Sequence, residues 1–285
     1  MDPLRAPPTF SIVIPAYEAA DSIGDALASA LGQAHPAHEV IVVDDGSGDD
    51  LEAALASFAD RIVLIRKPNG GVASARNAGI EAASGDFLVM QDADDRCDPS
   101  RLAALAELAS ARPDLDLITT DIRFTVDGEA VGIFRDQNPF EVEDQRTAIL
   151  WSCFLGGWPA VRLARLREVG GFDEDLRTGE DWDCWLRLIF SGSIAGLIEA
   201  PYYDYAIDSE GLTADRVSSL WDRVALLEKA AAEVELRDAE RRQLRRSLRH
   251  QRSVAALCEA RAGVERGGSR RRAARLARLP GLTAR

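Results

Sequence analysis

Short apolar segments alternate with helical segments through the first 120 residues, and no other feature restricts the fold of this chain as strongly. Five strands are predicted from apolar, β-rich runs at residues 10–15, 39–43, 61–65, 86–90 and 115–120. Helical spacing of apolar residues occupies the intervals, at residues 21–31, 49–58, 72–83 and 99–111. Strands that alternate with helices indicate βαβ units, and continuously apolar strands indicate a sheet covered on both faces. We therefore expect an α/β fold with a mostly parallel central sheet flanked by helices.

The remainder of the chain divides into an irregular part and a helical part. Residues 121–160 show little periodicity and contain Asp127 and Gly128, a pair typical of a hairpin turn. A helix is predicted from about Glu180, and helical spacing returns from Ser218 almost to the C-terminus. The expected organisation is one domain at residues 1–215, followed by an arginine-rich helical extension at residues 216–285.

The net charge of −13 conceals a strong asymmetry. Residues 1–240 hold 20 basic and 45 acidic side chains, whereas residues 241–285 hold 14 arginines and two acidic residues. An acidic body disfavours nucleic-acid binding. The basic tail is compatible with a helix at an anionic membrane surface, with a solvated helix, or with a helix packed on the acidic body.

Hydrophobicity and cysteine pattern indicate the cellular compartment of the protein. No uncharged apolar run reaches the length that a membrane span requires, and the first residues lack the pattern of a signal peptide. Four widely spaced cysteines form no CxxC pair, which disfavours a zinc site or a disulfide framework. We expect a cytoplasmic protein, with peripheral contact at the inner face of the cell membrane as an open alternative.

Carboxylates gather where three predicted strands end. Asp44 and Asp45 follow the second strand, Asp92 and Asp94 follow the fourth, and Glu18 follows the first. Ligands of open parallel sheets bind beyond the carboxyl ends of the strands. Close carboxylates repel one another unless a cation joins them, and hard oxygen ligands suit Mg²⁺ or Mn²⁺ together with diphosphate oxygens and water. The alternative is that these residues only cap helices and turns.

Five segments in order resemble glycosyltransferase family 2, with its GT-A fold, and the resemblance covers about residues 9–215. They read Ser-Ile-Val-Ile-Pro-Ala-Tyr-Glu (11–18), Val-Ile-Val-Val-Asp-Asp-Gly-Ser (40–47), Asn-Gly-Gly-Val-Ala-Ser-Ala-Arg-Asn-Ala-Gly (69–79), Asp-Phe-Leu-Val-Met-Gln-Asp-Ala-Asp-Asp (86–95) and, within 170–187, Gly-Gly-Phe-Asp-Glu-Asp-Leu followed by Gly-Glu-Asp-Trp-Asp-Cys-Trp-Leu-Arg. The resemblance implies an inverting enzyme that uses a nucleoside diphosphate sugar.

The resemblance also implies roles for individual residues. Asp45 or its neighbour Asp44 would accept the N–H group of the nucleotide base. The other residues implied to contact the nucleotide sugar are Pro15, Ala16, Tyr17, Glu18, Asn69, Gly71, Arg76, Asn77, Asp92, Ala93 and Asp94.

Three acidic residues carry the chemistry that the resemblance implies. Asp94 of the DxD motif would bind the metal ion, Mn²⁺ or Mg²⁺, directly, and Asp92 at the same metal site would contact the ribose or a water molecule bound to the metal. Asp181 would be the general base and Glu180 a second catalytic group that orients the acceptor. Inversion requires one base to deprotonate the acceptor hydroxyl, and a helix N-terminus tolerates its charge. Capping of that helix is the structural alternative for this pair.

Tryptophans supply candidates for the acceptor site. Trp151 and Trp158 lie in the irregular segment before the acidic pair. Trp182 and Trp185 are expected in the core of their helix, with Trp182 retained as a further candidate for acceptor binding.

One departure from the family pattern concerns the metal. Many members place a histidine after the base, but residues 203–209 contain none, so Asp204 or Asp208 could replace it. The chain also lacks the Gln-x-x-Arg-Trp signature of processive synthases.

The expected function is transfer of one sugar from a nucleoside diphosphate sugar, with a UDP-linked donor favoured, to a carbohydrate or lipid-linked glycan of a bacterial envelope. The alternatives are an inactive glycosyltransferase-like binding or scaffold protein and a sugar-phosphate nucleotidyltransferase. The second would require a glycine-rich basic N-terminal loop, which residues 15–18 do not form.

Overall fold

A computed structural model describes residues 6–141, 143–156, 158–207 and 216–265. Its strands are β1 (Phe10–Ala16), β2 (Glu39–Asp44), β3 (Val63–Arg66), β4 (Phe87–Met90), β5 (Arg96–Cys97), β6 (Leu117–Val126), β7 (Glu129–Ile133), β8 (Ala160–Arg162) and β9 (Ala195–Ala206). Its helices are α1 (Ile23–Leu31), α2 (Leu51–Leu55), α3 (Val72–Ala82), α4 (Arg101–Ala111), α5 (Gln145–Ile149), α6 (Leu163–Glu168), α7 (Glu180–Phe190), α8 (Arg216–Glu233) and α9 (Asp238–Glu265), with short 3-10 helices η1 (Ala56–Arg61) and η2 (Phe134–Asp136).

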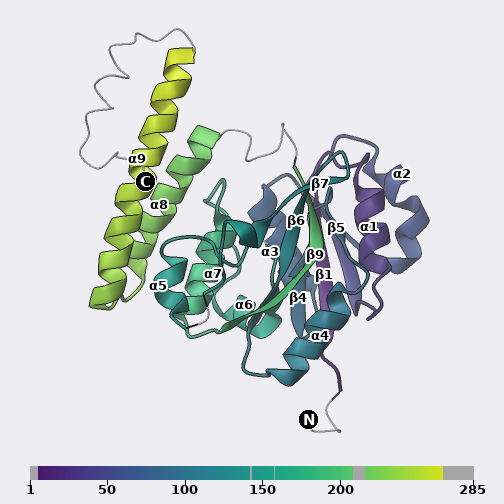
Figure 1. The fold of residues 1–285 in the computed structure, drawn as a ribbon. Helices are drawn as coiled ribbons and strands as arrows, with labels where there is room; N and C mark the ends of the chain where they lie inside the picture. The colour runs from purple at the N-terminus through teal and green to yellow at the C-terminus, as the bar shows by residue number, and fades with distance from the viewer. Residues whose placement is uncertain (1–5, 142, 157, 208–215, 266–285) are drawn as a thin grey trace. The chain divides into compact units, whose positions relative to one another are not determined.

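The strands form one sheet in the order β3-β2-β1-β4-β8-β6-β9-β5, with β7 paired to β6 (Figure 1). The first four strands are parallel, so that Ala16 of β1 lies opposite Asp44 of β2. Beyond β4 the directions are mixed: β8 runs antiparallel to both of its neighbours, β6 and β9 are parallel to each other, and β5 runs antiparallel to β9. The sheet is therefore mixed, and the mostly parallel arrangement predicted from the sequence holds for its first half.

The hairpin predicted at Asp127 and Gly128 is present between β6 and β7, and both turn residues have positive φ. Strands β5, β8 and β9 and helices α5 and α6 were not predicted. Strands β5 and β8 have two and three residues, which is too short for a periodic signal. Strand β9 contains Pro201 and is half-buried along most of its length, so its apolar residues do not form a continuous run.

Helices pack on both faces of the parallel strands. Phe10, Ile12 and Ile14 of β1 belong to an apolar core cluster shared with α1 and α4. On the other face α3 packs closely on β1, since a Cβ atom at Gly79 would lie 2.3 Å from Cγ1 of Val13. This close approach brings the N-terminal half of α3 toward the carboxyl ends of the strands.

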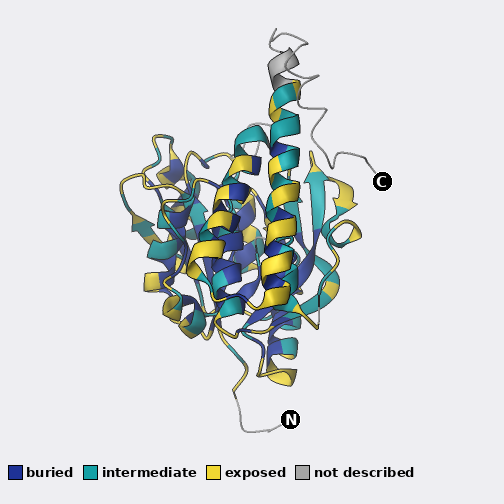
Figure 2. Cartoon of the chain, turned by 90° about the vertical axis from the view of Figure 1, so that its left-hand side faces the viewer, coloured by how far each residue is buried: buried dark blue, intermediate teal, exposed yellow. Residues whose placement is uncertain are grey.

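The chain divides into two compact units, one comprising residues 1–175 and 180–208 and the other residues 176–179 and 209–285. In the second unit α8 and α9 pack together, and each helix is buried along one side and exposed along the other (Figure 2). Leu227 of α8 and Ala255 of α9 are fully buried. Residue 215, the expected end of the first domain, lies within residues 208–215, which are outside the described part of the chain.

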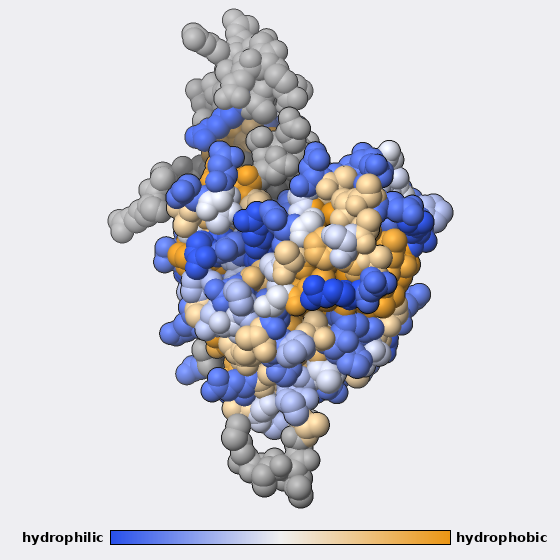
Figure 3. Space-filling view, turned by 90° about the vertical axis from the view of Figure 1, so that its right-hand side faces the viewer, coloured by the Kyte–Doolittle hydropathy of each residue, from blue (hydrophilic) through white to orange (hydrophobic). Residues whose placement is uncertain are grey.

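The outer strand β3 is incompletely covered, because Val63 and Leu64 are 45% and 36% exposed. The side of the molecule that faces right in Figure 1 carries an apolar area interrupted by hydrophilic side chains (Figure 3). Within the described residues no helix is long and apolar enough to cross a membrane.

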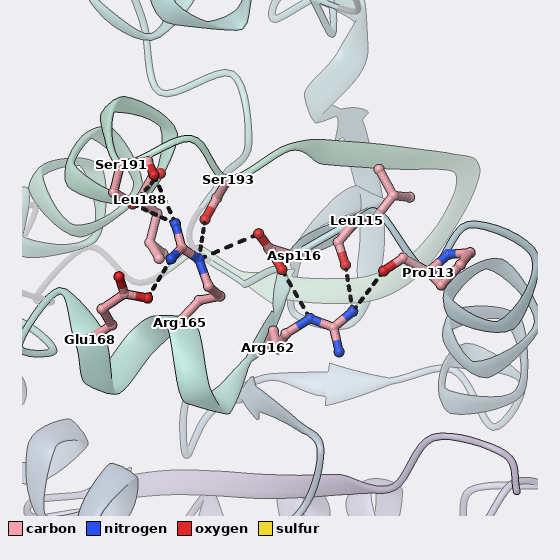
Figure 4. Close-up of polar contacts among 9 residues, drawn as sticks. All are labelled: Pro113, Leu115, Asp116, Arg162, Arg165, Glu168, Leu188, Ser191 and Ser193. Atoms are coloured by element: carbon pink, nitrogen blue, oxygen red, sulfur yellow. Dashed lines mark hydrogen bonds and ion pairs between the residues drawn. The ribbon is translucent and has the colours of Figure 1, made fainter. Parts of the chain in front are cut away.

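The C-terminal end of α7 is anchored by a network of arginines (Figure 4). Arg165 of α6 donates to the carbonyl oxygen of Ser191 (2.9 Å) and to Oγ of Ser193 (3.2 Å), and pairs with Asp116 at 3.5 Å. Asp116 also accepts a hydrogen bond from Nε of Arg162 (2.9 Å). These contacts fix one end of the helix whose other end carries Glu180 and Asp181.

Candidate active site

The loops after β1 and β2 are tied to each other. The carboxylate of Glu18 accepts a hydrogen bond from the N–H group of Gly48 (2.7 Å), and the N–H group of Glu18 donates to Oγ of Ser47 (3.2 Å). Glu18 has a φ of 51°, an uncommon value for a residue other than glycine. Tyr17, immediately before it, is 56% exposed. The loop thus presents an aromatic ring beyond the ends of the strands.

The two aspartates after β2 have different surroundings. Asp45 is 3% exposed and accepts hydrogen bonds from Nζ of Lys67 (2.6 Å) and from the N–H groups of Gly70 and Gly71 (3.0 and 2.8 Å). Asp44 is half-buried and accepts a hydrogen bond from the N–H group of Ser47 (2.9 Å). Both oxygens of Asp45 therefore hold the loop after β3.

That loop contains the predicted nucleotide contacts Asn69 and Gly71, both exposed. Its backbone packs tightly on the loop after β2, since a Cβ atom at Gly46 would lie 2.8 Å from the nitrogen of Asn69. Gly46 also has a φ of 79°, so a larger residue is disfavoured here on both grounds.

The DxD motif follows β4, with Ala93 buried between Asp92 and the exposed Asp94. Asp92 is held on both sides: Oδ1 accepts from Nη2 of Arg76 (2.9 Å), and Oδ2 accepts from the indole N–H of Trp158 (2.9 Å). Asp94 is exposed whereas Asp92 is half-buried, so Asp94 is the more accessible of the two carboxylates.

Arg76 connects the DxD motif with the acidic pair of α7. Its side chain is 8% exposed and donates to Oε1 of Glu180 (2.5 Å) as well as to Asp92. Burial by itself lowers the pKa of Arg76, but the charges of Asp92 and Glu180 raise it above its usual value. The guanidinium stays charged and brings segments 104 residues apart in the sequence to one place.

Asp181 lies in the first turn of α7, where its Oδ1 accepts the N–H group of Trp182 (2.7 Å). Burial and the adjacent charge of Glu180 raise its pKa to about 6, although Arg76 acts in the opposite direction. A carboxyl group with a pKa close to neutral accepts a proton more readily than an ordinary aspartate does.

A second network, which the sequence analysis missed, holds the DxD loop from behind. The hydroxyl of Tyr203 donates to Oδ2 of Asp95 (2.8 Å) and accepts the N–H group of Asp92 (3.1 Å). Asp95 also accepts the N–H group of Ala206 (2.8 Å), and burial, then the charge of Asp92, raise its pKa to about 9. The ring of Tyr203 stacks on Trp158. The one sequence signal for this network was Asp95, a third aspartate directly after the DxD motif.

Several predicted site residues have other contacts. The amide of Asn77 donates to the carbonyl oxygen of Phe172 (2.9 Å) and accepts its N–H group (2.8 Å), so this side chain joins α3 to the segment before α7. Trp182 is 4% exposed and its indole N–H donates to Ile149, which places it in the core and leaves no ring face for an acceptor. Trp158 is half-buried and contacts Asp92, as described above.

Asp204 and Asp208 were the two candidates to replace the missing histidine as a metal ligand. Asp204 forms an ion pair with Arg123 at 2.7 Å, which argues against its use as a metal ligand. Asp208 lies outside the described residues. Among the described residues, no cluster of three or more acidic, histidine or cysteine side chains could hold a metal ion by itself.

The site combines strand-end carboxylates, a DxD motif and an acidic pair at a helix N-terminus. The model of glycosyl transferase family 2 matches residues 11–162, more than half of the chain. The chain therefore belongs to this family.

Relatives in sequence agree with this membership. An uncharacterized glycosyltransferase of Rickettsia typhi is 28% identical over 210 residues, which are 70% of this chain and 62% of the relative. The chondroitin synthase of Pasteurella multocida is 31% identical over 199 residues, 68% of this chain but 20% of the synthase. The chain thus spans less than two thirds of the length of these relatives.

Solved structures share the fold. TarS of Staphylococcus aureus, in complex with UDP-GlcNAc, has a TM-score of 0.69 at 21% identity and covers 84% of this chain and 71% of its own. The mannosyltransferase PcManGT of Pyrobaculum calidifontis, in complex with GDP-Man and Mn²⁺, has a TM-score of 0.65 at 22% identity and covers 95% of this chain and 79% of its own. The GT-A fold expected from the sequence is confirmed.

Proposed function

We propose that this glycosyltransferase moves a single sugar, with inversion and with the help of a divalent metal ion, from a nucleoside diphosphate sugar to a glycan acceptor. The observation that carries the proposal is the bridge by Arg76 between Asp92 and Glu180. Through this bridge the predicted diphosphate site and the predicted base lie beside each other, as a direct displacement requires.

The base in this proposal is Asp181. It takes the proton of the acceptor hydroxyl while that oxygen attacks the anomeric carbon and the diphosphate departs on the opposite side. Its raised pKa favours this step. Glu180, held by Arg76, keeps the first turn of α7 beside the DxD loop and orients the acceptor.

The proposed donor is a UDP-sugar. Two observations support a nucleotide at the ends of β1 and β2: the exposed ring of Tyr17 and the half-buried carboxylate of Asp44, a hydrogen-bond acceptor for the N–H group of a base. Asp45 contributes by holding the loop that would close over the nucleotide. UDP-GlcNAc bound to TarS, which has the same fold, is consistent with this choice.

The residues present fit a divalent ion held together with a diphosphate. Asp94 provides an exposed hard oxygen ligand, and Mg²⁺ and Mn²⁺ are commonly bound by one or two carboxylates with phosphate oxygens and water. The ion would neutralise charge that develops on the leaving diphosphate. Asp92 would act on ribose or ligated water, since its oxygens accept hydrogen bonds from Arg76 and Trp158.

Thermal-shift measurements with nucleotide sugars test the proposal directly. A UDP-sugar at about 100 times its Kd, with Mn²⁺, should stabilise the protein by about 2.7 kcal/mol, which corresponds to a shift of about 5–10 °C. Asp94→Ala should lose the metal-dependent part of this shift, whereas the exposed Asp60→Ala should retain it. Transfer undiminished by EDTA would contradict the metal assignment.

The main alternative is an inactive binding or scaffold protein with a glycosyltransferase fold. Asp94 follows β4 and Asp181 lies in the first turn of α7, so carboxylates suited to a metal ligand and a base are both present, which supports an enzyme. Product analysis separates the two: an active inverting enzyme forms a glycoside of opposite anomeric configuration to the donor, whereas a scaffold releases no nucleoside diphosphate from any donor.

The proposed acceptor is a carbohydrate or lipid-linked glycan of a bacterial envelope, reached from the cytoplasmic side of the membrane. The exposed arginines of α9 support contact with an anionic lipid surface: Arg241, Arg242, Arg245, Arg246, Arg249 and Arg252. Leu244 is 3% exposed, so the apolar stripe of this helix is used within the second unit and the contact would be electrostatic.

Vesicle sedimentation tests this contact. Each arginine near an anionic surface contributes about 1 kcal/mol, so the combined change Arg241→Gln, Arg242→Gln and Arg245→Gln should weaken binding to phosphatidylserine vesicles about a hundredfold. Binding of the unchanged protein should also fall steeply with added salt. Replacement of the exposed Arg61 and Arg66 by glutamine should have little effect, and equal losses in both variants would contradict a specific role for α9.

A further inference from the structure

The DxD motif forms a tight turn between β4 and the short strand β5. The N–H group of Asp95, the residue after the motif, donates to the carbonyl oxygen of Asp92 (3.2 Å) and closes the turn. Strand β5 then lies at the end of the sheet and pairs with β9, where Cys97 is opposite Tyr203. The position of the turn therefore depends on β9 at one end, as it depends on β4 at the other.

One hydroxyl group joins the two ends of this turn. Oη of Tyr203 accepts the N–H group of Asp92 (3.1 Å) and donates to Oδ2 of Asp95 (2.8 Å). Oδ1 of the same carboxylate accepts the N–H group of Ala206 (2.8 Å), so β9 holds Asp95 at two points. Tyr203 is 0% exposed and Asp95 is 1% exposed. Because water cannot replace these hydrogen bonds, it is costly to leave them unmade.

The ring of Tyr203 is itself held in place. Its centroid lies 5.1 Å from that of Trp158, with the two rings stacked, and 4.6 Å from the guanidinium carbon of Arg101. Arg101 is 1% exposed and donates to the carbonyl oxygen of Trp158 (2.5 Å). The indole N–H of Trp158 in turn donates to Oδ2 of Asp92 (2.9 Å). The backbone and the side chain of Asp92 are thus held by one buried cluster, which lies entirely within the first compact unit.

Asp94, the exposed carboxylate proposed to bind the metal ion, lies between the two residues that Tyr203 joins. We propose that Tyr203 is a positioning residue for the metal–diphosphate site, acting through Asp92 and Asp95. This inference rests on the proposed function, in which Asp94 binds the ion. Removing a group that orients a metal ligand typically weakens metal binding about 10- to 100-fold.

Tyr203→Phe tests the proposal in the full-length protein. Phenylalanine keeps the stacked ring but can neither accept the N–H group of Asp92 nor donate to Asp95. Mn²⁺ is titrated by electron paramagnetic resonance in the presence of UDP or GDP, whichever binds the unchanged protein more tightly. The Kd of Mn²⁺ should rise about 10- to 100-fold in this variant. Binding of the corresponding nucleoside monophosphate in EDTA should be retained, because the base is proposed to lie at the ends of β1 and β2.

Tyr202→Phe is the matched control. It removes the same hydroxyl group from the preceding residue of β9, whose half-buried side chain points to the opposite face of the strand. The Kd of Mn²⁺ should stay that of the unchanged protein.

Two substitutions of Asp95 separate the position of the turn from the charge of this residue. In Asp95→Asn the amide group can donate to Oη of Tyr203, and the amide oxygen can accept the N–H group of Ala206. The Kd of Mn²⁺ should therefore stay close to that of the unchanged protein. Asp95→Ala keeps neither contact and should raise the Kd as Tyr203→Phe does.

A Kd of Mn²⁺ unchanged in Tyr203→Phe would overturn the proposal, and so would an equal rise in Tyr202→Phe. Loss of monophosphate binding in Tyr203→Phe would reject a role confined to the metal–diphosphate site. Equal rises in Asp95→Asn and Asp95→Ala would assign the effect to the charge of Asp95 and contradict positioning.

Asp94→Ala distinguishes failure of this inference from failure of the proposed function. Mn²⁺ binding intact in Asp94→Ala would reject the metal site, and with it the positioning role. Loss of Mn²⁺ binding in Asp94→Ala, together with intact binding in Tyr203→Phe, would reject the positioning role alone.

Discussion

Asp181→Asn should lower the rate of sugar transfer by about 10²- to 10⁴-fold, the contribution expected of a general base. Asparagine has nearly the same shape but cannot take the proton of the acceptor hydroxyl. It can still accept the N–H group of Trp182, as Asp181 does, so the start of α7 should be preserved. Binding of the nucleoside diphosphate should remain within about twofold, because the donor residues lie at the ends of other elements.

The pH dependence provides a second test of the same assignment. The pKa of Asp181 is about 6, and a base works when it is deprotonated. The kcat of the unchanged protein should therefore fall as the pH decreases through about 6 and level off above it. Asp175→Asn, an exposed substitution of the same kind six residues earlier, should leave both the rate and the pH profile unchanged. Equal rates for Asp181→Asn and Asp175→Asn would show that Asp181 is not the base.

Arg76→Met should have the largest effect on stability. The methionine fills a similar space but removes the cation that pairs with Asp92 and Glu180, at 2.9 and 2.5 Å. Glu180 is 7% exposed, so its carboxylate would remain buried without a partner. Breaking a buried ion pair in this way typically costs about 3–5 kcal/mol. Arg76→Lys should recover only part of the loss, because one ammonium group cannot reproduce the two directed contacts of a guanidinium.

Urea unfolding measures this effect, and the exposed ion pair of Arg66 with Glu52 provides the matched control. The side chains of that pair are 54% and 80% exposed, so Arg66→Met should change the free energy of unfolding very little. Equal urea midpoints for Arg76→Met and Arg66→Met would show that the bridge does not contribute to stability.

The sequence alone determined the elements whose signal is local. Strands β1, β2 and β4 are continuously apolar because both of their faces are buried, so their positions were predicted closely. Their ends then located Asp44, Asp92 and Asp94, since the carboxyl ends of parallel strands meet at one edge. Asp181 was a different case, because a base and a helix cap share the same sequence pattern, and the assignment came from the family resemblance.

Tertiary structure alone decided which of these residues contact one another. Arg76, expected from the sequence to contact the nucleotide, also donates to Asp92 and to Glu180, two contacts that the sequence did not predict. Tyr203 lies beside Asp95 because β9 pairs with β5, and neither short nor half-buried strands carry a periodic signal.

The acidic residues of the site show why local sequence patterns predict burial but not long-range contacts. Periodicity records which face of an element is buried, and this depends on neighbours a few residues away. The pairing of a guanidinium with a carboxylate 104 residues later, or of Tyr203 with Asp95, depends on how distant segments pack, which leaves no trace in local spacing. The sequence alone therefore identified the candidate acidic residues, whereas packing decided which of them are held by other side chains and which are exposed.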